Sequence, residues 1–132
     1  MIDVSRERFE LGLSQFERAL ARLREALAVE ETEIVRDAII QRFEFTYELG
    51  WKCMFYWLRT QKEKVPEVAR QVIQAAFRAE LIVDADLWER IKDYRDETSH
   101  TYDEKKAIEV AKFVRTDAVR AFDALKEKLK TF

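Results

Sequence analysis

Apolar residues recur every three or four positions along the first part of the chain, with Arg, Glu and Gln between them. This spacing places the apolar residues on one face of a helix and predicts a seam packed along another helix. We expect the helix to begin after Ser5 and to end near Val29. Its apolar stripe consists of Phe9, Leu13, Phe16, Leu20, Leu23 and Leu27.

The next segment is apolar around most of a helical circumference rather than along one stripe. Thr32 is a suitable N-cap, and we expect a helix from there to about Thr60. A helix that is hydrophobic nearly all round is buried, either centrally in a bundle or partly in an oligomer interface. The apolar residues are Ile39, Ile40, Phe43, Phe45, Tyr47, Leu49, Trp51, Met54, Phe55, Trp57 and Leu58.

Glu44, Glu48 and Lys52 interrupt this apolar segment at intervals of four residues. One interpretation is a solvated stripe with a Glu48–Lys52 pair, which stabilises a helix by about 0.2–0.5 kcal/mol. The other interpretation is the polar wall of a cleft, because so little else of this helix is polar. The spacing alone is compatible with both.

Three further helices are predicted in the second half of the chain. Pro66 suits the first turn of a helix that ends near Glu80, and Asp84 suits the N-cap of the following helix. The last helix is expected to begin at about Asp103 and to run nearly to the end of the chain. The expected inward residues are Val68, Val72, Ala75, Ala79, Leu87, Ile91, either Tyr94 or Arg95, Ile108, Ala111, Ala118, Phe122, Leu125 and Leu129. We predict an all-α, up-and-down bundle of about five helices, forming a single domain over residues 1–132.

Composition narrows the class of protein further. Two glycines and one proline among 132 residues leave little turn chemistry for a β-protein. The net charge of −2 gives no global basic footprint of the kind that non-specific nucleic-acid binding favours. The single cysteine, Cys53, excludes an intramolecular disulfide framework and is typical of a reducing compartment. No apolar leader or membrane-spanning run is present in the sequence, so we expect a soluble cytoplasmic protein without membrane contact.

Candidate chemistry is concentrated in the segment from Arg95 to Tyr102, which holds the only histidine, His100. On an ideal helix, five residues turn the chain by about 500°, so Arg95 and His100 would point roughly 140° apart. They can face one site only if the helix stops near Ser99 or if two copies of the segment meet. Thr98 and Ser99 favour a stop, because their hydroxyls compete for backbone hydrogen bonds.

An imidazole, a guanidinium and a phenol in one segment suit chemistry on a phosphodiester. The imidazole transfers protons near neutral pH, and the guanidinium binds phosphate oxygens and offsets charge that develops in the transition state. In RNA the nucleophile is the substrate's own 2′-hydroxyl, so we predict neither a metal nor a cofactor. The alternative is an incidental histidine at a helix–helix corner. Cys53 lies in the most apolar helix and is expected to be a buried structural thiol.

The pattern Arg95-x4-His100-x-Tyr102 resembles the motif of HEPN domains, the higher eukaryote and prokaryote nucleotide-binding family. The segments 43–52 and 99–104 are similar to one branch of it, the nucleotidyltransferase substrate-binding proteins. The similarity covers nearly the whole chain, with both segments in the expected order. It implies a toxin of a toxin–antitoxin pair that acts as a homodimeric, metal-independent endoribonuclease. Its implied partner is a minimal nucleotidyltransferase antitoxin.

The resemblance also implies roles for individual residues. Arg95 would bind the scissile phosphate in a cleft between two subunits, and His100 would be the general acid and base. Tyr102 would accept AMP groups from the antitoxin, which would block the cleft with bulk and negative charge. The family often has Asn after the motif arginine, whereas this chain has Asp96, a carboxylate expected to neutralise Arg95 or repel RNA.

Three functions are therefore compatible with the sequence. The first is an RNA-cleaving toxin, for which Lys105 and Lys106 either contact RNA or form a solvated helix face. The second is a non-catalytic subunit that uses Arg95 and His100 to hold a nucleotide for a nucleotidyltransferase. The third is a structural helical dimer, which does not account for the two family-like segments.

Overall fold

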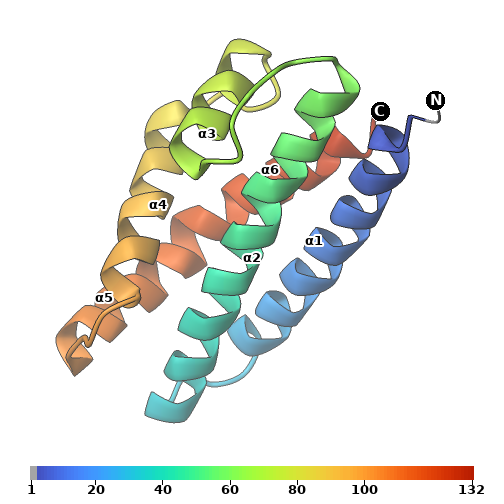
Figure 1. Cartoon of the computed structure of the whole chain (residues 1–132). Helices are drawn as coiled ribbons and strands as arrows, with labels where there is room; N and C mark the ends of the chain where they lie inside the picture. The colour runs from blue at the N-terminus through green and yellow to red at the C-terminus, as the bar shows by residue number, and fades with distance from the viewer. Residues whose placement is uncertain (1–2) are drawn as a thin grey trace.

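Two long antiparallel helices form one side of the molecule (Figure 1). In the computed structural model, which describes residues 3–132, α1 spans Ser5–Leu27 and α2 spans Glu33–Thr60. The Thr32 hydroxyl accepts a hydrogen bond from the Val35 N–H at 3.2 Å, which caps α2 as predicted. Gly12 and Gly50 bring the two helices close together, because a Cβ on either would lie 3.0 Å from an aromatic ring of the other helix.

Two shorter helices, α3 (Ala69–Arg78) and α4 (Ala85–Thr98), follow on the other side of α2 (Figure 1). The prediction that Pro66 lies in the first turn of α3 was wrong, because Val68 is the extended residue that precedes the helix. Val68 and Ala79 consequently lie outside α3 and are exposed rather than inward. As predicted, the Asp84 carboxylate caps α4 by accepting the Leu87 N–H at 3.0 Å.

The last long helix is continuous from Glu104 to Leu129, but one of its turns is wider than the rest. It comprises α5 (Glu104–Phe113), the π-helical segment η1 (Val114–Ala118) and α6 (Val119–Leu129). Ile108 was expected to face inward and is instead 46% exposed, because Ala107 and Val110 occupy the inward face of that turn. Counted as one helix, this run completes the predicted all-α up-and-down bundle of five helices, and residues 3–132 contain no strand.

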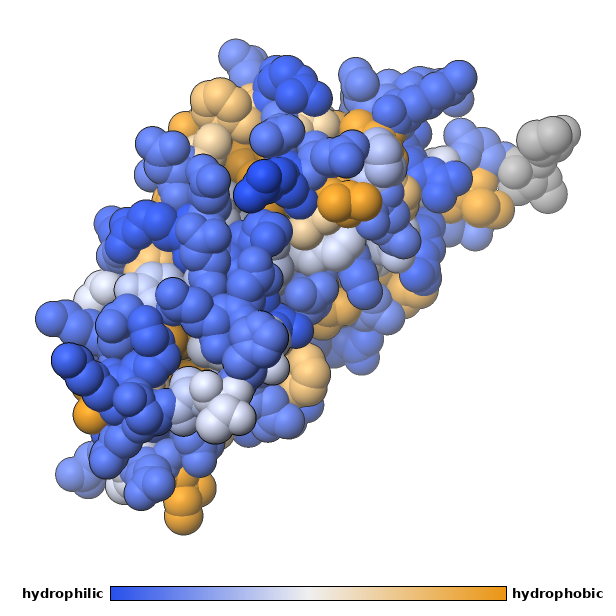
Figure 2. Space-filling model, turned by 60° about the vertical axis from the view of Figure 1, so that its left-hand side comes forward, coloured by the Kyte–Doolittle hydropathy of each residue, from blue (hydrophilic) through white to orange (hydrophobic). Residues whose placement is uncertain are grey.

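Phe122 lies at the centre of the core and joins most of the helices. Its ring centroid is 6.2 Å from those of Phe16 in α1 and Phe43 in α2, and 5.7 Å from that of Trp88 in α4. The expected stripe of α1 packs into the same core. The face of the molecule drawn in Figure 2 is largely hydrophilic. Among residues 3–132, none of the helices combines the length and low charge needed to cross a membrane.

Candidate active site

The segment from Arg95 to Tyr102 forms a corner between α4 and α5. Helix α4 ends at Thr98, and Ser99 follows as its C-cap, with its hydroxyl donating to the Asp96 carbonyl at 2.6 Å. The Asp103 carboxylate accepts the Lys106 N–H at 2.8 Å and so begins α5. The helix therefore stops where the hydroxyl-bearing residues predicted, and the helical phase of Arg95 no longer fixes the direction of His100.

Arg95 points from α4 toward α2, where two carboxylates meet its guanidinium. Its Nη1 lies 3.3 Å from Glu44 Oε2, and its Nε lies 3.5 Å from Glu48 Oε1. Both contacts are ion pairs rather than hydrogen bonds, and within residues 3–132 the buried Nε–H of Arg95 has no hydrogen-bond partner. Two negative charges thus surround one positive charge, and one guanidinium donor is unsatisfied.

Further contacts hold both carboxylates in place. The Thr98 hydroxyl lies 2.9 Å from Glu44 Oε2 and 3.0 Å from the Arg95 carbonyl, so its proton is donated to one of these two oxygens. Glu48 Oε2 accepts the indole N–H of Trp51 at 3.0 Å. We refer to Glu44, Glu48 and Arg95 as the acidic clamp.

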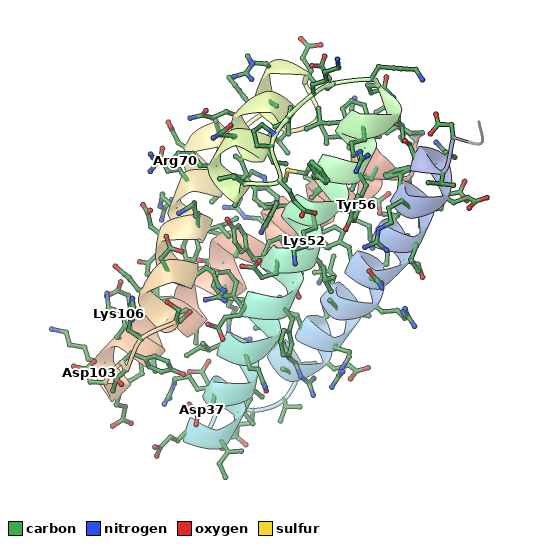
Figure 3. All side chains as sticks on the ribbon, viewed as in Figure 1. Asp37, Lys52, Tyr56, Arg70, Asp103 and Lys106 are labelled. Atoms are coloured by element: carbon green, nitrogen blue, oxygen red, sulfur yellow. The ribbon has the colours of Figure 1, made fainter. Side chains whose placement is uncertain are left out.

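The solvated-stripe interpretation of α2 does not describe Glu44 and Glu48, because both carboxylates face Arg95. Lys52 differs from them: its ammonium lies 5.9 Å from the ring centroid of Trp51, and Glu48 pairs with Arg95 instead of Lys52. Figure 3 shows that Lys52 lies on a part of α2 away from the corner, which Asp103 marks. The expected Glu48–Lys52 pair is therefore not formed.

His100 and Tyr102 lie in different surroundings beyond the end of α4. His100 is exposed, and its backbone N–H donates to the Glu97 carbonyl at 3.4 Å. Tyr102 is half-buried against the core, and burial raises the pKa of its phenol, with the negative charges of Asp37 and Glu44 adding to the effect. Within residues 3–132, no hydrogen bond or ion pair joins Arg95 to His100 or Tyr102.

Two other charged residues of the corner are already paired. Asp96 accepts the Lys92 ammonium at 2.8 Å rather than contacting Arg95, so the expected neutralisation of Arg95 comes from Glu44 and Glu48 instead. Lys106 donates to Glu97 at 3.2 Å and to Glu109 at 3.3 Å. These hydrogen bonds raise the pKa of the Lys106 ammonium. Figure 3 shows Lys106 and Asp103 together at this end of the bundle, with Asp37 across from them on α2.

The acidic clamp is the part of the site that the sequence did not reveal. Thr98 and Glu44 are 54 positions apart, and their contact depends on how α4 packs on α2. The only signal was the four-residue spacing of Glu44 and Glu48 in an otherwise apolar helix. That signal indicated a polar wall but did not identify the residue that it faces.

Fold and corner together define an all-helical bundle with an arginine, a histidine and a tyrosine around one helix–helix turn. The profile of the family described as "Nucleotidyltransferase substrate binding protein like" matches residues 11–131. The chain belongs to this family, which confirms the resemblance found in segments 43–52 and 99–104.

Individual relatives agree with this assignment. One, from Haemophilus influenzae and named "Probable ribonuclease HepT", is 35% identical over 88 residues, which cover 61% of this chain and 60% of that protein. The chain thus matches somewhat less than two thirds of this curated relative. A solved structure from Thermus thermophilus is 33% identical, with a TM-score of 0.79, and covers 87% of this chain and 98% of that one.

A more distant structure shows the same fold. The tri-AMPylated HEPN toxin of Shewanella oneidensis, solved in complex with an MNT antitoxin, is 15% identical to this chain. It covers the whole of both chains with a TM-score of 0.77. The chain therefore has the fold of a HEPN toxin.

Proposed function

We propose that this protein is a HEPN-type toxin, a metal-independent endoribonuclease that acts in the cytoplasm as a homodimer. The observation that carries the proposal is the corner at which α4 stops, leaving His100 exposed directly beyond the helix that holds Arg95. The name of the Haemophilus influenzae relative supports a ribonuclease, and the Shewanella oneidensis toxin supports an antitoxin partner of the MNT class.

In the proposed reaction, the imidazole of His100 takes the proton from a ribose 2′-hydroxyl. The 2′-oxygen attacks the adjacent phosphorus, and the 5′-oxygen leaves with a proton from the imidazolium of the same residue in the second copy. The products are a 2′,3′-cyclic phosphate and a 5′-hydroxyl. Two copies are invoked because the attacking 2′-oxygen and the departing 5′-oxygen lie on opposite sides of the phosphorus, so that one imidazole takes the first proton while the other donates the second.

Arg95 holds the scissile phosphate and offsets the charge that develops on it. Its unsatisfied Nε–H is available to a phosphate oxygen once Glu48 moves aside. Glu44 is the more buried of the two carboxylates, with a side chain 23% exposed against 36% for Glu48, and its contact with Arg95 is the shorter one. The proposed cleft wall is thus formed by Glu44 and Glu48, with Lys52 further along the same helix.

Control of the toxin is proposed to act through Tyr102. A minimal nucleotidyltransferase antitoxin would transfer AMP from ATP to the Tyr102 hydroxyl, releasing pyrophosphate. Each AMP group adds bulk and negative charge beside Arg95, where an RNA phosphate has to bind. The half-buried ring of Tyr102 fixes where that charge is placed.

The test is cleavage of RNA by wild type and His100→Ala in the presence of EDTA. Both proteins are expressed without the antitoxin, and intact mass is measured to show that Tyr102 carries no AMP. We expect wild type to cut and His100→Ala to be inactive with unchanged helicity and oligomeric state. Tyr102→Phe is the matched control, which should cut RNA and resist silencing by the antitoxin.

The acidic clamp favours one alternative, a non-catalytic subunit that presents a nucleotide to a nucleotidyltransferase. With two carboxylates around it, Arg95 binds an incoming phosphate less readily than a free guanidinium does. If unmodified wild type cuts no RNA at any concentration yet binds a nucleotidyltransferase, the nuclease proposal is wrong and this alternative replaces it.

A further inference from the structure

A groove of about 550 Å³ runs between α1 and α2, away from the corner. Figure 1 shows these two helices side by side, with α1 and α4 on opposite sides of α2. All of its lining residues come from these two helices, and none of them is acidic. The lining residues are Gln15, Arg18, Ala19, Arg22, Ala38, Gln41, Arg42, Phe45 and Leu49.

Three arginines give the groove a local positive charge in a chain whose net charge is −2. Arg18 and Arg22 line it without a carboxylate partner among residues 3–132. Arg42 is already engaged, because its Nη1 donates to the Arg22 carbonyl at 2.7 Å and lies 3.9 Å from Glu25. Two guanidinium groups are therefore available for an anion.

The remaining lining supplies an aromatic face and amide groups. Phe45 is 56% exposed, although it lies in a helix that is otherwise largely buried. Single-stranded nucleic acids bind by stacking bases on such aromatic rings while arginines hold the backbone. Gln15 and Gln41 offer donors and acceptors for base edges, and Ala19 and Ala38 leave the floor open to a flat ring. The groove has the volume of a small-ligand site.

We infer that the groove between α1 and α2 is a binding site for single-stranded RNA, with a base on Phe45 and phosphates on Arg18 and Arg22. The inference rests on the proposed ribonuclease function and adds a second RNA contact to it. Phe45 follows Glu44 directly, so the two side chains point about 100° apart around α2. An RNA strand in the groove crosses one helix, about 10 Å wide, to reach Arg95.

The test measures binding separately from cleavage. A fluorescein-labelled single-stranded RNA of about twelve nucleotides, within the usual site size for such strands, is titrated with the His100→Ala protein, and anisotropy is recorded at several salt concentrations. Arg18→Ala combined with Arg22→Ala should weaken binding about tenfold. It should also reduce the slope of log K against log salt by about 1.4, since each phosphate contact on a single strand contributes about 0.7.

The matched control removes the same charge elsewhere. Arg70 and Arg78 on α3 are also exposed and are not paired with a carboxylate among the described residues, and Figure 3 shows Arg70 on the far side of α2 from α1. Arg70→Ala combined with Arg78→Ala should leave both the affinity and the salt slope nearly unchanged. Equal losses of affinity in the two double variants would mean that RNA binding depends only on the net charge of the protein, which overturns the inference.

Phe45→Leu separates stacking from charge, because it keeps an apolar side chain. It should weaken RNA binding roughly tenfold without changing the salt slope. A fall in dimer mass on light scattering in this variant would show that a second copy occupies the groove, and the inference would be wrong. Free ATP binding as tightly as RNA, with the same dependence on Arg18 and Arg22, would also overturn it in favour of a mononucleotide site.

Failure of the groove and failure of the nuclease are distinguishable. Suppose that wild type cuts no RNA while the His100→Ala protein still binds RNA through Arg18, Arg22 and Phe45. The inference of an RNA-binding groove is then supported, and the proposed nuclease function is wrong. If wild type cuts RNA but the groove variants bind RNA as tightly as the His100→Ala protein alone, the inference of an RNA-binding groove is wrong and the proposed nuclease function is supported.

Discussion

Phe43 and Glu44, two consecutive residues of α2, face different regions of the molecule. Phe43 points into the core, where its ring packs against Phe122 at a centroid distance of 6.2 Å. Glu44 points to the corner, where its carboxylate contacts Arg95 and Thr98. One helix thus carries both the packing that holds the bundle together and the charges that shape the candidate site.

The two regions differ in how their positions are fixed. Phe122 is fully buried among rings from three other helices, so displacing it leaves a cavity that nothing else fills. The acidic clamp is partly exposed and is held by a few directed contacts to ionised groups. We expect stability to depend mainly on the core, and chemistry to depend on the corner.

The largest predicted effect is that of Phe122→Ala. Truncating a fully buried phenylalanine removes its transfer free energy and opens a cavity, so the free energy of unfolding should fall by about 3–5 kcal/mol. Urea unfolding followed by circular dichroism measures the loss. Phe77→Ala, at a residue that is 45% exposed, is the control and should cost far less. Similar losses in both variants would contradict a core centred on Phe122.

The next effect is that of Glu44→Gln at the corner. The variant keeps an acceptor for the Thr98 hydroxyl but loses the charge that faces Arg95, so the free energy of unfolding should fall by about 1–2 kcal/mol. Glu97→Gln is the control, because Glu97 is 47% exposed and contacts Lys106 at the same corner. That variant should cost less than about 1 kcal/mol in the same urea experiment. A loss no larger in Glu44→Gln would show that the clamp does not hold Arg95.

The fold was predictable because its signals are local. The stripe of α1 and the caps Thr32 and Asp84 lie within one or two turns of what they determine, and the structure has them as expected. The errors at Val68 and Ile108 arose where an apolar residue lies at the edge of a helix or of its inward face. At such positions periodicity alone does not distinguish a core residue from an exposed one.

The site was less predictable because its contacts are distant in sequence. The motif placed Arg95, His100 and Tyr102 at a corner, but the partners of Arg95 come from another helix. The choice between Asp96 and Glu44 as the carboxylate that neutralises Arg95 depends on helix packing, which the residue spacing does not contain. The groove between α1 and α2 was missed for the same reason, since Arg18 and Phe45 line one groove only when α1 packs against α2.

A smaller loss of stability is expected at high pH, from one tyrosine in the core and one at the corner. Burial raises the pKa of the Tyr47 and Tyr102 phenols above the usual value of 10.0. At pH values well below 10, both residues are protonated in the folded and unfolded chains, so their contribution to stability is fully present. As the pH rises further, the unfolded chain loses these protons first, and the free energy of unfolding should fall.

Tyr47→Phe isolates the core contribution to this pH dependence. Among residues 3–132 the buried Tyr47 hydroxyl has no hydrogen-bond partner, so the variant should unfold at nearly the same urea concentration as wild type at about pH 7. Between about pH 9 and pH 11, around the usual pKa of a phenol, it should lose less stability than wild type. A parallel fall in both proteins would mean that Tyr47 does not contribute to the alkaline transition.

The smallest predicted effect is that of Asp96→Asn, which tests whether the corner is controlled by residues adjacent in sequence or adjacent in space. Asp96 is 61% exposed and pairs with Lys92 one helical turn away, a contact worth less than about 0.5 kcal/mol. Stability and RNA cleavage should therefore both remain close to wild type, whereas Glu48→Gln, which changes a carboxylate that contacts Arg95, should alter cleavage. A large gain in cleavage in Asp96→Asn alone would instead show that the residue next to Arg95 in sequence repels the RNA. The acidic clamp would then be a structural feature without a role in the reaction.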